Sequence, residues 1–549
     1  MKQKFSPSLI LARPGAIDWK LLIFLVLFLN VKLLVKVVAV VIIYVLRPDF
    51  KFGFRLKGSR LPLFYLLIIA IGILGWLFSG LITNFNYDIV LATGILFWIL
   101  CILAIHQIKL SVETNDPAVI HRTIIAFFII NALVSLAIYT GIILETGHIN
   151  PYRYQGNFQK YFIGTGDYIK GISFDTSTTN AVLNAFGVIY FLSRGKYLLT
   201  IMCMAVLLLT GSNISNLLLI AVLLFLFFFQ TSKDQKSIIV VCLLMLAVFL
   251  VKVSPQNNEY VVAAWEKIFD KEPEKKDVVK MIPITQRPDS LLTSEEKKQK
   301  FAQLYMDSVN LAVFEKSQLA GGSISNSMTK AWEKPEIPKD SIHTPTFQHK
   351  NDTNAVEKSL LKFVAKNDPA VPISAGVTAK PKLPGKLIAL RQTARYFKQH
   401  PSKIVAGTGI GNFSSKLAFR ATSMRIAGSY PAKYSYINDD FRSNHLELYA
   451  FYFADTDGRH SIINSPNSTY DQLLAEYGLL GIGSFLFFYL AFFAKKLRRQ
   501  TYAIPLLLFF LGALFIEYWF EQLSVVIFFE LLVLLNIKEI NFNSTHETN

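Results

Sequence analysis

The stretch Ser465-Pro-Asn-Ser-Thr-Tyr-Asp-Gln-Leu-Leu-Ala-Glu-Tyr-Gly-Leu-Leu-Gly481 joins a long polar region to an apolar run that ends in basic residues. Pro466 followed by Asn and Ser is typical of a helix start, and apolar residues recur at helical spacing from Leu473 to Leu480. We therefore expect a membrane helix with polar side chains at its mouth, beneath a large loop. Such a mouth suits the chemistry of a membrane enzyme; a capped helix start is the alternative interpretation.

The composition indicates a membrane protein. Apolar residues make up 52% of the 549 residues and charged residues 17%, and the apolar residues are concentrated in long blocks. The net charge of +18 does not indicate nucleic-acid binding, because much of the Lys and Arg lies in short loops between apolar blocks. The three cysteines, Cys101, Cys203 and Cys242, lie inside apolar blocks, so we expect no disulfide in the long loop.

The apolar blocks and basic loops predict an all-α polytopic protein with about twelve transmembrane helices. The first block (21–46) is interpreted as a tight hairpin; a single span there would give eleven. The last block (503–535) is interrupted by Glu517 and Glu521 and predicts a hairpin turned outward. We interpret the two glutamates as a polar turn at the interface, with an intramembrane functional acid as the alternative.

These spans divide the chain into three regions. Residues 1–254 form an N-terminal transmembrane bundle, 255–470 a large outer loop, and 471–549 the C-terminal helices with a short cytoplasmic tail. Within the loop, 323–384 is rich in Ser, Thr, Pro and Lys, which predicts an irregular or mobile segment. Residues 385–399 predict a helix that ends before Pro401, with Leu387, Leu390, Ala394 and Phe397 on its apolar face.

A possible anion site follows from this helix. Arg391 and Arg395 lie beside its apolar face, and a glycine-rich turn with Gly409 and Gly411 comes next. Guanidinium groups and the backbone N–H groups of such a turn can bind a phosphate or diphosphate. The alternatives are a solvated basic face and a tight turn. The loop histidines lack metal-ligand spacing, so no metal is expected.

Two further polar units share the predicted outer face. Arg153 belongs to a loop that leads into the dense polar run from Asp175 to Asn180, at the outer end of a predicted span. Helix capping explains part of this run, and a wet pocket suited to glycans is the alternative. The second unit is the turn Thr210-Gly-Ser-Asn213.

Together these units resemble the O-antigen ligase and polymerase superfamily of bacterial membrane glycan transferases. The similarity covers most of the chain from about 141 to 493, apart from the Ser/Pro/Lys-rich insert. It rests on Arg153, Gly156 and Asn180-Ala181, on Thr210-Gly-Ser212, on Arg391, Pro401 and Gly407 to Phe413, and on Asn467 to Gly481.

The resemblance implies a GT-C-like fold with a mainly helical periplasmic loop, in the bacterial inner membrane. It implies an inverting glycosyltransferase that uses no metal or cofactor and takes its glycan from undecaprenyl diphosphate. A ligase of lipopolysaccharide biosynthesis would transfer this glycan to a hydroxyl of lipid A core. A polymerase of O-antigen or exopolysaccharide would transfer it to another glycan. Arg391, and more loosely Arg153, would hold the diphosphate leaving group.

Two other functions remain open. A protein O-oligosaccharyltransferase would use the same donor, and the large loop would suit a protein acceptor. A non-catalytic partner that binds or transports glycan lipid is the second. Few charges within the spans and no internal duplication argue against a transporter.

The sequence departs from the family pattern at two positions. Asn213 stands where the family has an arginine after Thr-x-Ser, and Asn467 where it has a histidine. Asparagine can orient a hydroxyl but cannot act as a general base. The candidates for that role are Asp471, Asp175, His460 and His445. The remaining residues of the predicted substrate-binding set are Arg395, Asn180, Asn213, Gly409, Gly411 and Tyr470.

Overall fold

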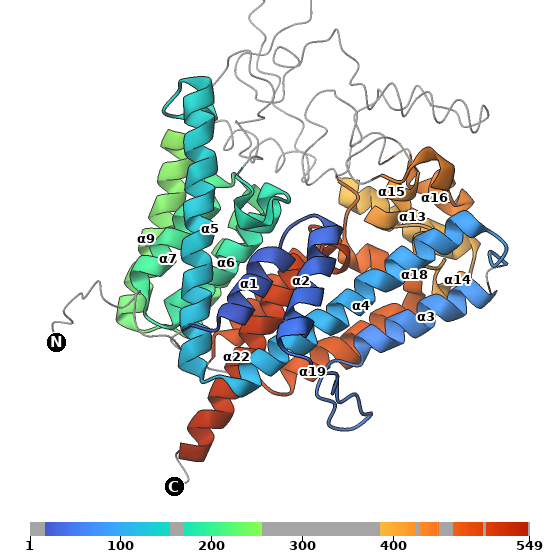
Figure 1. Cartoon of the computed structure of the whole chain (residues 1–549). Coiled ribbons are helices and arrows are strands. Elements are labelled where there is room, and N and C mark those ends of the chain that lie inside the picture. The colour runs from blue at the N-terminus through green and yellow to red at the C-terminus, as the bar shows by residue number, and fades with distance from the viewer. Residues whose placement is uncertain are drawn as a thin grey trace, which may run out of the picture. The chain divides into compact units, whose positions relative to one another are not determined.

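The computed structural model describes residues 17–78, 80–153, 169–254, 385–422, 429–446, 448, 465–497 and 501–546. Within these ranges the secondary structure is helical, with no β-strand (Figure 1). The predicted loop segment 255–384, with its irregular part 323–384, lies outside the described residues, as does His460.

The N-terminal part consists of consecutive helices joined mostly by short turns. The first two helices form the predicted hairpin, and the loop after α5 contains short 3-10 turns at Pro151–Arg153 and Gly171–Ser173. The helices are α1 (Trp19–Phe28), α2 (Leu33–Leu46), α3 (Phe64–Phe78), α4 (Phe85–Thr114), α5 (Pro117–Thr146), α6 (Ser177–Ser193), α7 (Tyr197–Leu209), α8 (Asn213–Phe229) and α9 (Lys233–Val248), which continues as a π-turn over Phe249–Val253.

The C-terminal part begins with short helices of the predicted loop: α13 (Gly385–Gln399), α14 (Lys403–Ala406), α15 (Lys416–Ala421) and α16 (Asp439–Asn444). The organising stretch forms α18 (Thr469–Ser484), which continues through a π-helical segment (Phe485–Leu490) into α19 (Ala491–Ala494). The predicted last hairpin consists of α20 (Ala503–Ala513) and α22 (Ser524–His546), with the short α21 (Trp519–Gln522) between them.

Four of the described helical segments are long and apolar enough to cross a membrane: Phe85–Thr114, Pro117–Thr146, Lys233–Val253 and Thr469–Ala494. Six shorter apolar helices accompany them: α1, α2, α3, α7, α8 and α20. This inventory supports the predicted class of an all-α membrane protein.

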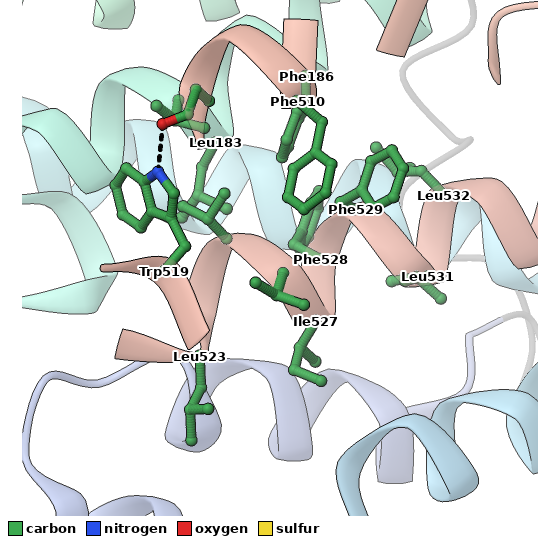
Figure 2. Packing of buried hydrophobic residues seen from close by; sticks show 14 of the residues in the cluster. Leu183, Phe186, Phe510, Trp519, Leu523, Ile527, Phe528, Phe529, Leu531 and Leu532 are labelled. Carbon is green, nitrogen blue, oxygen red and sulfur yellow. Dashed lines mark hydrogen bonds between the residues drawn. The ribbon is translucent and has the colours of Figure 1, made fainter. Parts of the chain in front are cut away.

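The core is built around α22, which packs against α4, α6 and α20. Its residues from Val525 to Leu535 are almost completely buried and are apolar apart from Glu530, which accepts a hydrogen bond from the Tyr65 hydroxyl at 2.5 Å. The rings of Phe510 and Phe529 stack with their centroids 4.0 Å apart, and Trp519 Nε1 donates to the Ala513 carbonyl at 2.6 Å (Figure 2). These contacts fix the turn between α20 and α22.

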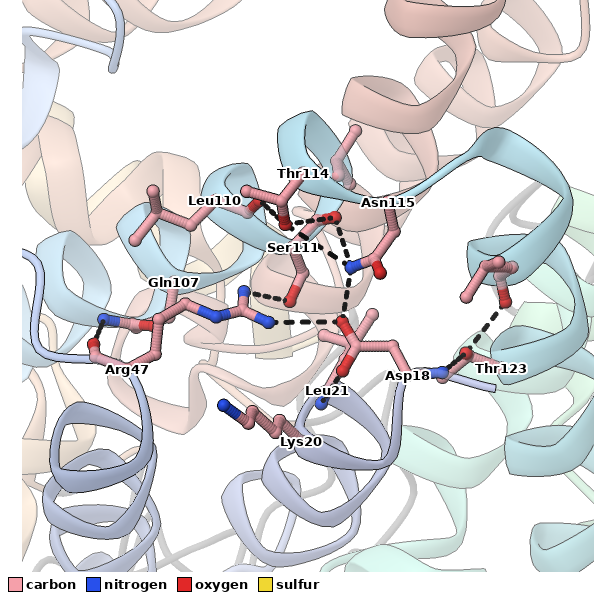
Figure 3. A network of polar contacts seen from close by, with 12 residues as sticks. Asp18, Lys20, Leu21, Arg47, Gln107, Leu110, Ser111, Thr114, Asn115 and Thr123 are labelled. Atoms are coloured by element: carbon pink, nitrogen blue, oxygen red, sulfur yellow. Dashed lines mark hydrogen bonds and ion pairs between the residues drawn. The ribbon is translucent and has the colours of Figure 1, made fainter. Parts of the chain in front are cut away.

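The helix ends gather into two groups. In the first, Arg47 at the end of α2 donates to Ser111 Oγ at 2.7 Å and pairs with Asp18 at 3.5 Å (Figure 3). Asn115, in the turn between α4 and α5, donates to the same carboxylate at 2.9 Å. Lys538 of α22 also donates to the Val112 carbonyl at 2.7 Å. The loops that connect the helices at this end are the loops in which the sequence has Lys and Arg between its apolar blocks.

The second group holds the connections that the sequence places outside. Val31, between α1 and α2, donates its N–H to the Ser173 carbonyl at 2.8 Å. Asn86 at the start of α4 donates to the Ser435 carbonyl at 3.0 Å. Lys36, buried near the tip of the first hairpin, donates to Ser524 Oγ at 3.1 Å. The two hairpins and the polar loop segments therefore share one end.

Candidate functional site

The polar end centres on α13, which rests on the start of α18 with a face that agrees only in part with the predicted one. Phe397 is buried as predicted, and Leu390 is half-buried. Leu387 and Ala394, also expected to be apolar contacts, are exposed, and Lys386 and Thr393 are buried instead. The reason is that Lys386 and Thr393 have polar partners beneath the helix, which periodicity alone cannot detect.

Lys386 joins three segments with its ammonium group. It donates to the Asn467 carbonyl, to the Ile516 carbonyl at 2.7 Å and to Ser465 Oγ at 3.3 Å. An ammonium group has three donors, and all three are used. Lys386 thereby ties α13 to the residues before α18 and to the turn after α20.

A pH dependence follows from this burial. Burial lowers the pKa of Lys386 to about 7, and the carboxylates of Glu517 and Asp471 offset part of the shift. The unfolded chain keeps this proton up to about pH 10.5. Lys386 should therefore contribute a free energy of unfolding that rises with pH above 7, by up to about 1.4 kcal/mol per pH unit. Thermal unfolding from pH 6 to 9 in detergent compares the wild-type chain with Lys386→Met, which should lack this contribution, so the difference between the two proteins should change with pH. The same pH dependence in both proteins would contradict the assignment.

Glu517 lies beside this lysine and holds Asn467. Its Oε2 accepts hydrogen bonds from Asn467 Nδ2 at 2.9 Å, from Gln522 Nε2 at 3.4 Å and from the Tyr518 N–H at 3.4 Å. Glu521, one helical turn further, accepts from Gln472 Nε2 at 2.7 Å and from the Leu417 N–H at 3.0 Å. The two glutamates do lie in a turn, as predicted, but in one that is packed on α18 and lined by carboxamides.

Several oxygens around this turn are buried without a hydrogen-bond partner. The three carboxamides use their NH2 groups on the two glutamates, which leaves Asn467 Oδ1, Gln472 Oε1 and Gln522 Oε1 unpaired. Ser468 Oγ is also unpaired, although Ser468 is the N-cap residue of α18. An unpaired buried polar group costs about 1–3 kcal/mol. Four such oxygens belong to residues around this one turn.

Asp471 is the centre of a second buried network. Its Oδ1 accepts from Thr393 Oγ1 at 2.7 Å, and its Oδ2 accepts from Ser414 Oγ at 2.6 Å. His445 Nε2 lies 3.3 Å from the same Oδ2, and His445 Nδ1 lies 2.8 Å from Gln392 Oε1. The structure thus brings together two of the predicted candidates for the base, Asp471 and His445. Both side chains are completely buried and use their polar atoms on each other and on neighbours.

The glycine-rich turn binds a carboxylate of the chain itself. The Gly411 N–H donates to Glu476 Oε2 at 3.0 Å, and the Phe413 N–H donates to Glu476 Oε1 at 3.3 Å. The Gly409 N–H donates to the Glu476 carbonyl at 3.0 Å. The donors that were predicted to bind a diphosphate therefore attach the turn to α18. The geometry is that of an anion-binding loop, but the Glu476 carboxyl group occupies it.

Arg391 and Arg395 lie on the exposed side of α13. Neither makes a hydrogen bond or ion pair with any residue that the structure describes. Arg391 lies two residues before Thr393, which bonds Asp471, and five residues after Lys386, which bonds Asn467. Uncommitted guanidinium groups therefore stand on the same helix that covers both carboxylate networks.

The polar run before α6 is mostly committed to structure. Asn180 is completely buried, and its amide bonds Asn131, Ser135 and the Ile169 carbonyl at 2.9–3.2 Å. Asp175 accepts from Thr179 Oγ1 at 3.0 Å and lies within electrostatic range of Lys36. Since Lys36 bonds Ser524, Asp175 belongs to the same end as Glu517.

The other predicted site residues are less informative. Tyr470 donates its hydroxyl to the Leu511 carbonyl at 2.8 Å, which is a structural bond between α18 and α20. Asn213 is half-buried at the first position of α8. Arg153 ends the 3-10 turn Pro151–Arg153, and only its backbone belongs to the described part.

Sequence reasoning missed Lys386, Gln472, Gln522 and Glu476 and gave Glu517 a minor role. One signal was available: Glu476 and Glu517 are isolated acids inside or beside apolar blocks, where charges are costly and usually functional or paired. Lys386 bonds residues about 80 and 130 positions away, and no local pattern in the sequence indicates these contacts. Comparison with protein-family models, with curated proteins and with solved structures gives no match for this chain.

Proposed function

We propose that the chain is a membrane glycosyltransferase that moves a glycan from undecaprenyl diphosphate to a hydroxyl acceptor. The observation that carries the proposal is the arrangement on α13. Its exposed face presents Arg391 and Arg395, and its buried face covers Asp471 and Asn467 at the mouth of the candidate span α18. Guanidinium groups suit a diphosphate, and the Glu517 carboxylate that holds Asn467 suits an attacking hydroxyl.

The proposal includes a membrane orientation. The end with Arg47, Arg194 and Lys538 would face the cytoplasm of the bacterial inner membrane, as the positive-inside rule favours. The end with α13 and the two hairpin turns would face the periplasm. With about twelve spans, this orientation would put the site on the face where the proposed reaction uses its lipid-linked glycan.

Removal of Arg391 tests the proposal. In a strain that lacks the gene, Arg391→Ala should restore at least 100-fold less glycan attachment than the wild-type chain, because a developing diphosphate charge loses a guanidinium partner. Arg391→Lys should restore an intermediate amount. Arg442→Ala removes a cation from α16, where it pairs with Asp439, and serves as the control. Wild-type attachment by Arg391→Ala would instead favour a non-catalytic partner.

The products of the deletion strain separate the forms of the proposal. A ligase predicts lipid-linked chains that accumulate without attachment. A polymerase predicts single repeat units on the acceptor, and a protein oligosaccharyltransferase predicts proteins that lack their glycan. Mass spectrometry of the lipid, glycan and protein fractions distinguishes these outcomes.

A further inference from the structure

The unpaired oxygens at the start of α18 surround a site that the sequence did not assign. Asn467 and Gln522 donate to the same oxygen of Glu517, so their carboxamides are neighbours. Ser468 and Gln472 are one helical turn apart on α18, and Gln472 bonds Glu521. Ser468 and Gln472 are 1% exposed and Gln522 is 6% exposed. The four orphaned oxygens thus belong to one small region between α18 and the turn 514–523.

The chemistry of this region selects its occupant. Three of the four unpaired atoms are carboxamide oxygens, which only accept, and the fourth is the Ser468 hydroxyl, which can also donate, so the occupant must bring donors and can bring acceptors. A metal cation would also suit oxygens, but the described residues hold no group of three or more His, Cys, Asp or Glu side chains that could bind one. A polyhydroxy compound brings neutral O–H groups, which both donate and accept.

Glu517 has the atom that such a hydroxyl needs. Its Oε2 is occupied by three N–H donors, whereas its Oε1 makes no hydrogen bond with the described residues. Glu517 as a whole is 6% exposed. Asn467, at the position where the family has a histidine, orients this carboxylate through its amide.

Resting on the proposed function, we infer that this region binds the acceptor sugar and that Glu517 is its catalytic base. The oxygens of Asn467, Ser468, Gln472 and Gln522 accept hydrogen bonds from the sugar's hydroxyl groups. One acceptor hydroxyl attacks the anomeric carbon of the donor, and its proton passes to Glu517 Oε1. The bond from that carbon to the diphosphate oxygen breaks, and its electron pair leaves with undecaprenyl diphosphate.

The test uses the purified full-length chain, added to membrane vesicles of the deletion strain, which contain the donor and the unmodified acceptor. Glu517→Gln should lower the rate of transfer at least 100-fold, because it removes the base at nearly constant shape. Glu517→Asp keeps a carboxylate and should retain more activity than Glu517→Gln. Glu113→Gln, at the opposite end of the helices, should transfer at the wild-type rate.

Ser468→Ala tests the acceptor contacts without the risk of misfolding, since Ser468 Oγ has no bond to lose. With acceptor extracted from the deletion strain, its KM for acceptor should rise about fivefold at unchanged kcat, as expected for one hydrogen bond. Ser443→Ala, an exposed serine of α16, is the matched control.

The outcomes separate the two proposals. If the wild-type chain transfers and Arg391→Ala does not, but Glu517→Gln keeps a third or more of the rate, the inference about Glu517 is wrong and the proposed function stands. An unchanged KM in Ser468→Ala overturns the acceptor site in the same way. If the wild-type chain itself transfers no glycan, the proposed function fails.

Discussion

Replacement of Gly478 by alanine should lower the free energy of unfolding by about 3 kcal/mol or more. Gly478 interrupts α18 with φ 64°, in the left-handed region, where a side chain costs about 1–2 kcal/mol. A Cβ there would also overlap the backbone around the Val405 carbonyl and the Gly407 nitrogen. Since the atoms in the way are backbone atoms, relief requires that α14 move away from α18, which adds about 1–3 kcal/mol.

Gly483 provides the control on the same helix. A Cβ at Gly483 would meet nothing within 4 Å, and its φ is not in the left-handed region. Thermal unfolding of the detergent-solubilised protein should therefore show Gly483→Ala close to the wild type and Gly478→Ala well below it. Equal unfolding temperatures for the two variants would contradict the described crossing of α18 with the segment 405–407.

Asp471→Ala should have the second large effect, again about 3 kcal/mol or more. The carboxylate accepts hydrogen bonds from Thr393 and Ser414 and lies against His445, and all of these groups are buried. Its removal leaves these donors without a partner, at about 1–3 kcal/mol each. The three partners belong to three separate segments, so removal of the carboxylate also weakens the attachment of α13 and α16.

Asp439→Ala is the matched comparison for this variant. Asp439 pairs with Arg442 at 2.9 Å, but its side chain is 85% exposed, and such surface pairs contribute about 0–1 kcal/mol. Thermal unfolding should thus separate two aspartates of similar chemistry by their burial alone. A comparable loss in both variants would mean that the network at Asp471 contributes little.

The helices could be predicted from the sequence because their signals are local. The helix Tyr197–Leu209 was predicted with its observed ends, since Lys196 and Thr210 bound a short apolar run. The helix Gly385–Gln399 also ends as predicted before His400-Pro401. In contrast, α4 extends from 85 to 114 where the apolar run predicted 89–108, because its polar ends are stabilised by neighbours and by the Asn84 cap.

The candidate site could be predicted only in part, because its bonds join residues far apart in the chain. The glycine turn was predicted to bind a phosphate or diphosphate, and nothing local shows that its N–H groups bond the Glu476 carboxyl group instead. In the same way, the face of α13 depends on Asp471, 78 positions beyond Thr393. Sequence patterns predicted which polar segments matter. Hydrogen bonds between residues far apart in the chain decide which of their side chains are left without a partner.

The bond between Lys36 and Ser524 has a consequence for how the protein is made. The two residues are 488 positions apart, so the first hairpin is synthesised long before its buried cation can meet its partner. At about 5–20 residues per second, the ribosome needs about 25–100 s to reach Ser524. Until then the Lys36 side chain has the Phe28 carbonyl of its own hairpin as an acceptor, at 2.8 Å. The bond that joins the first hairpin to the last helix can form only near the end of synthesis.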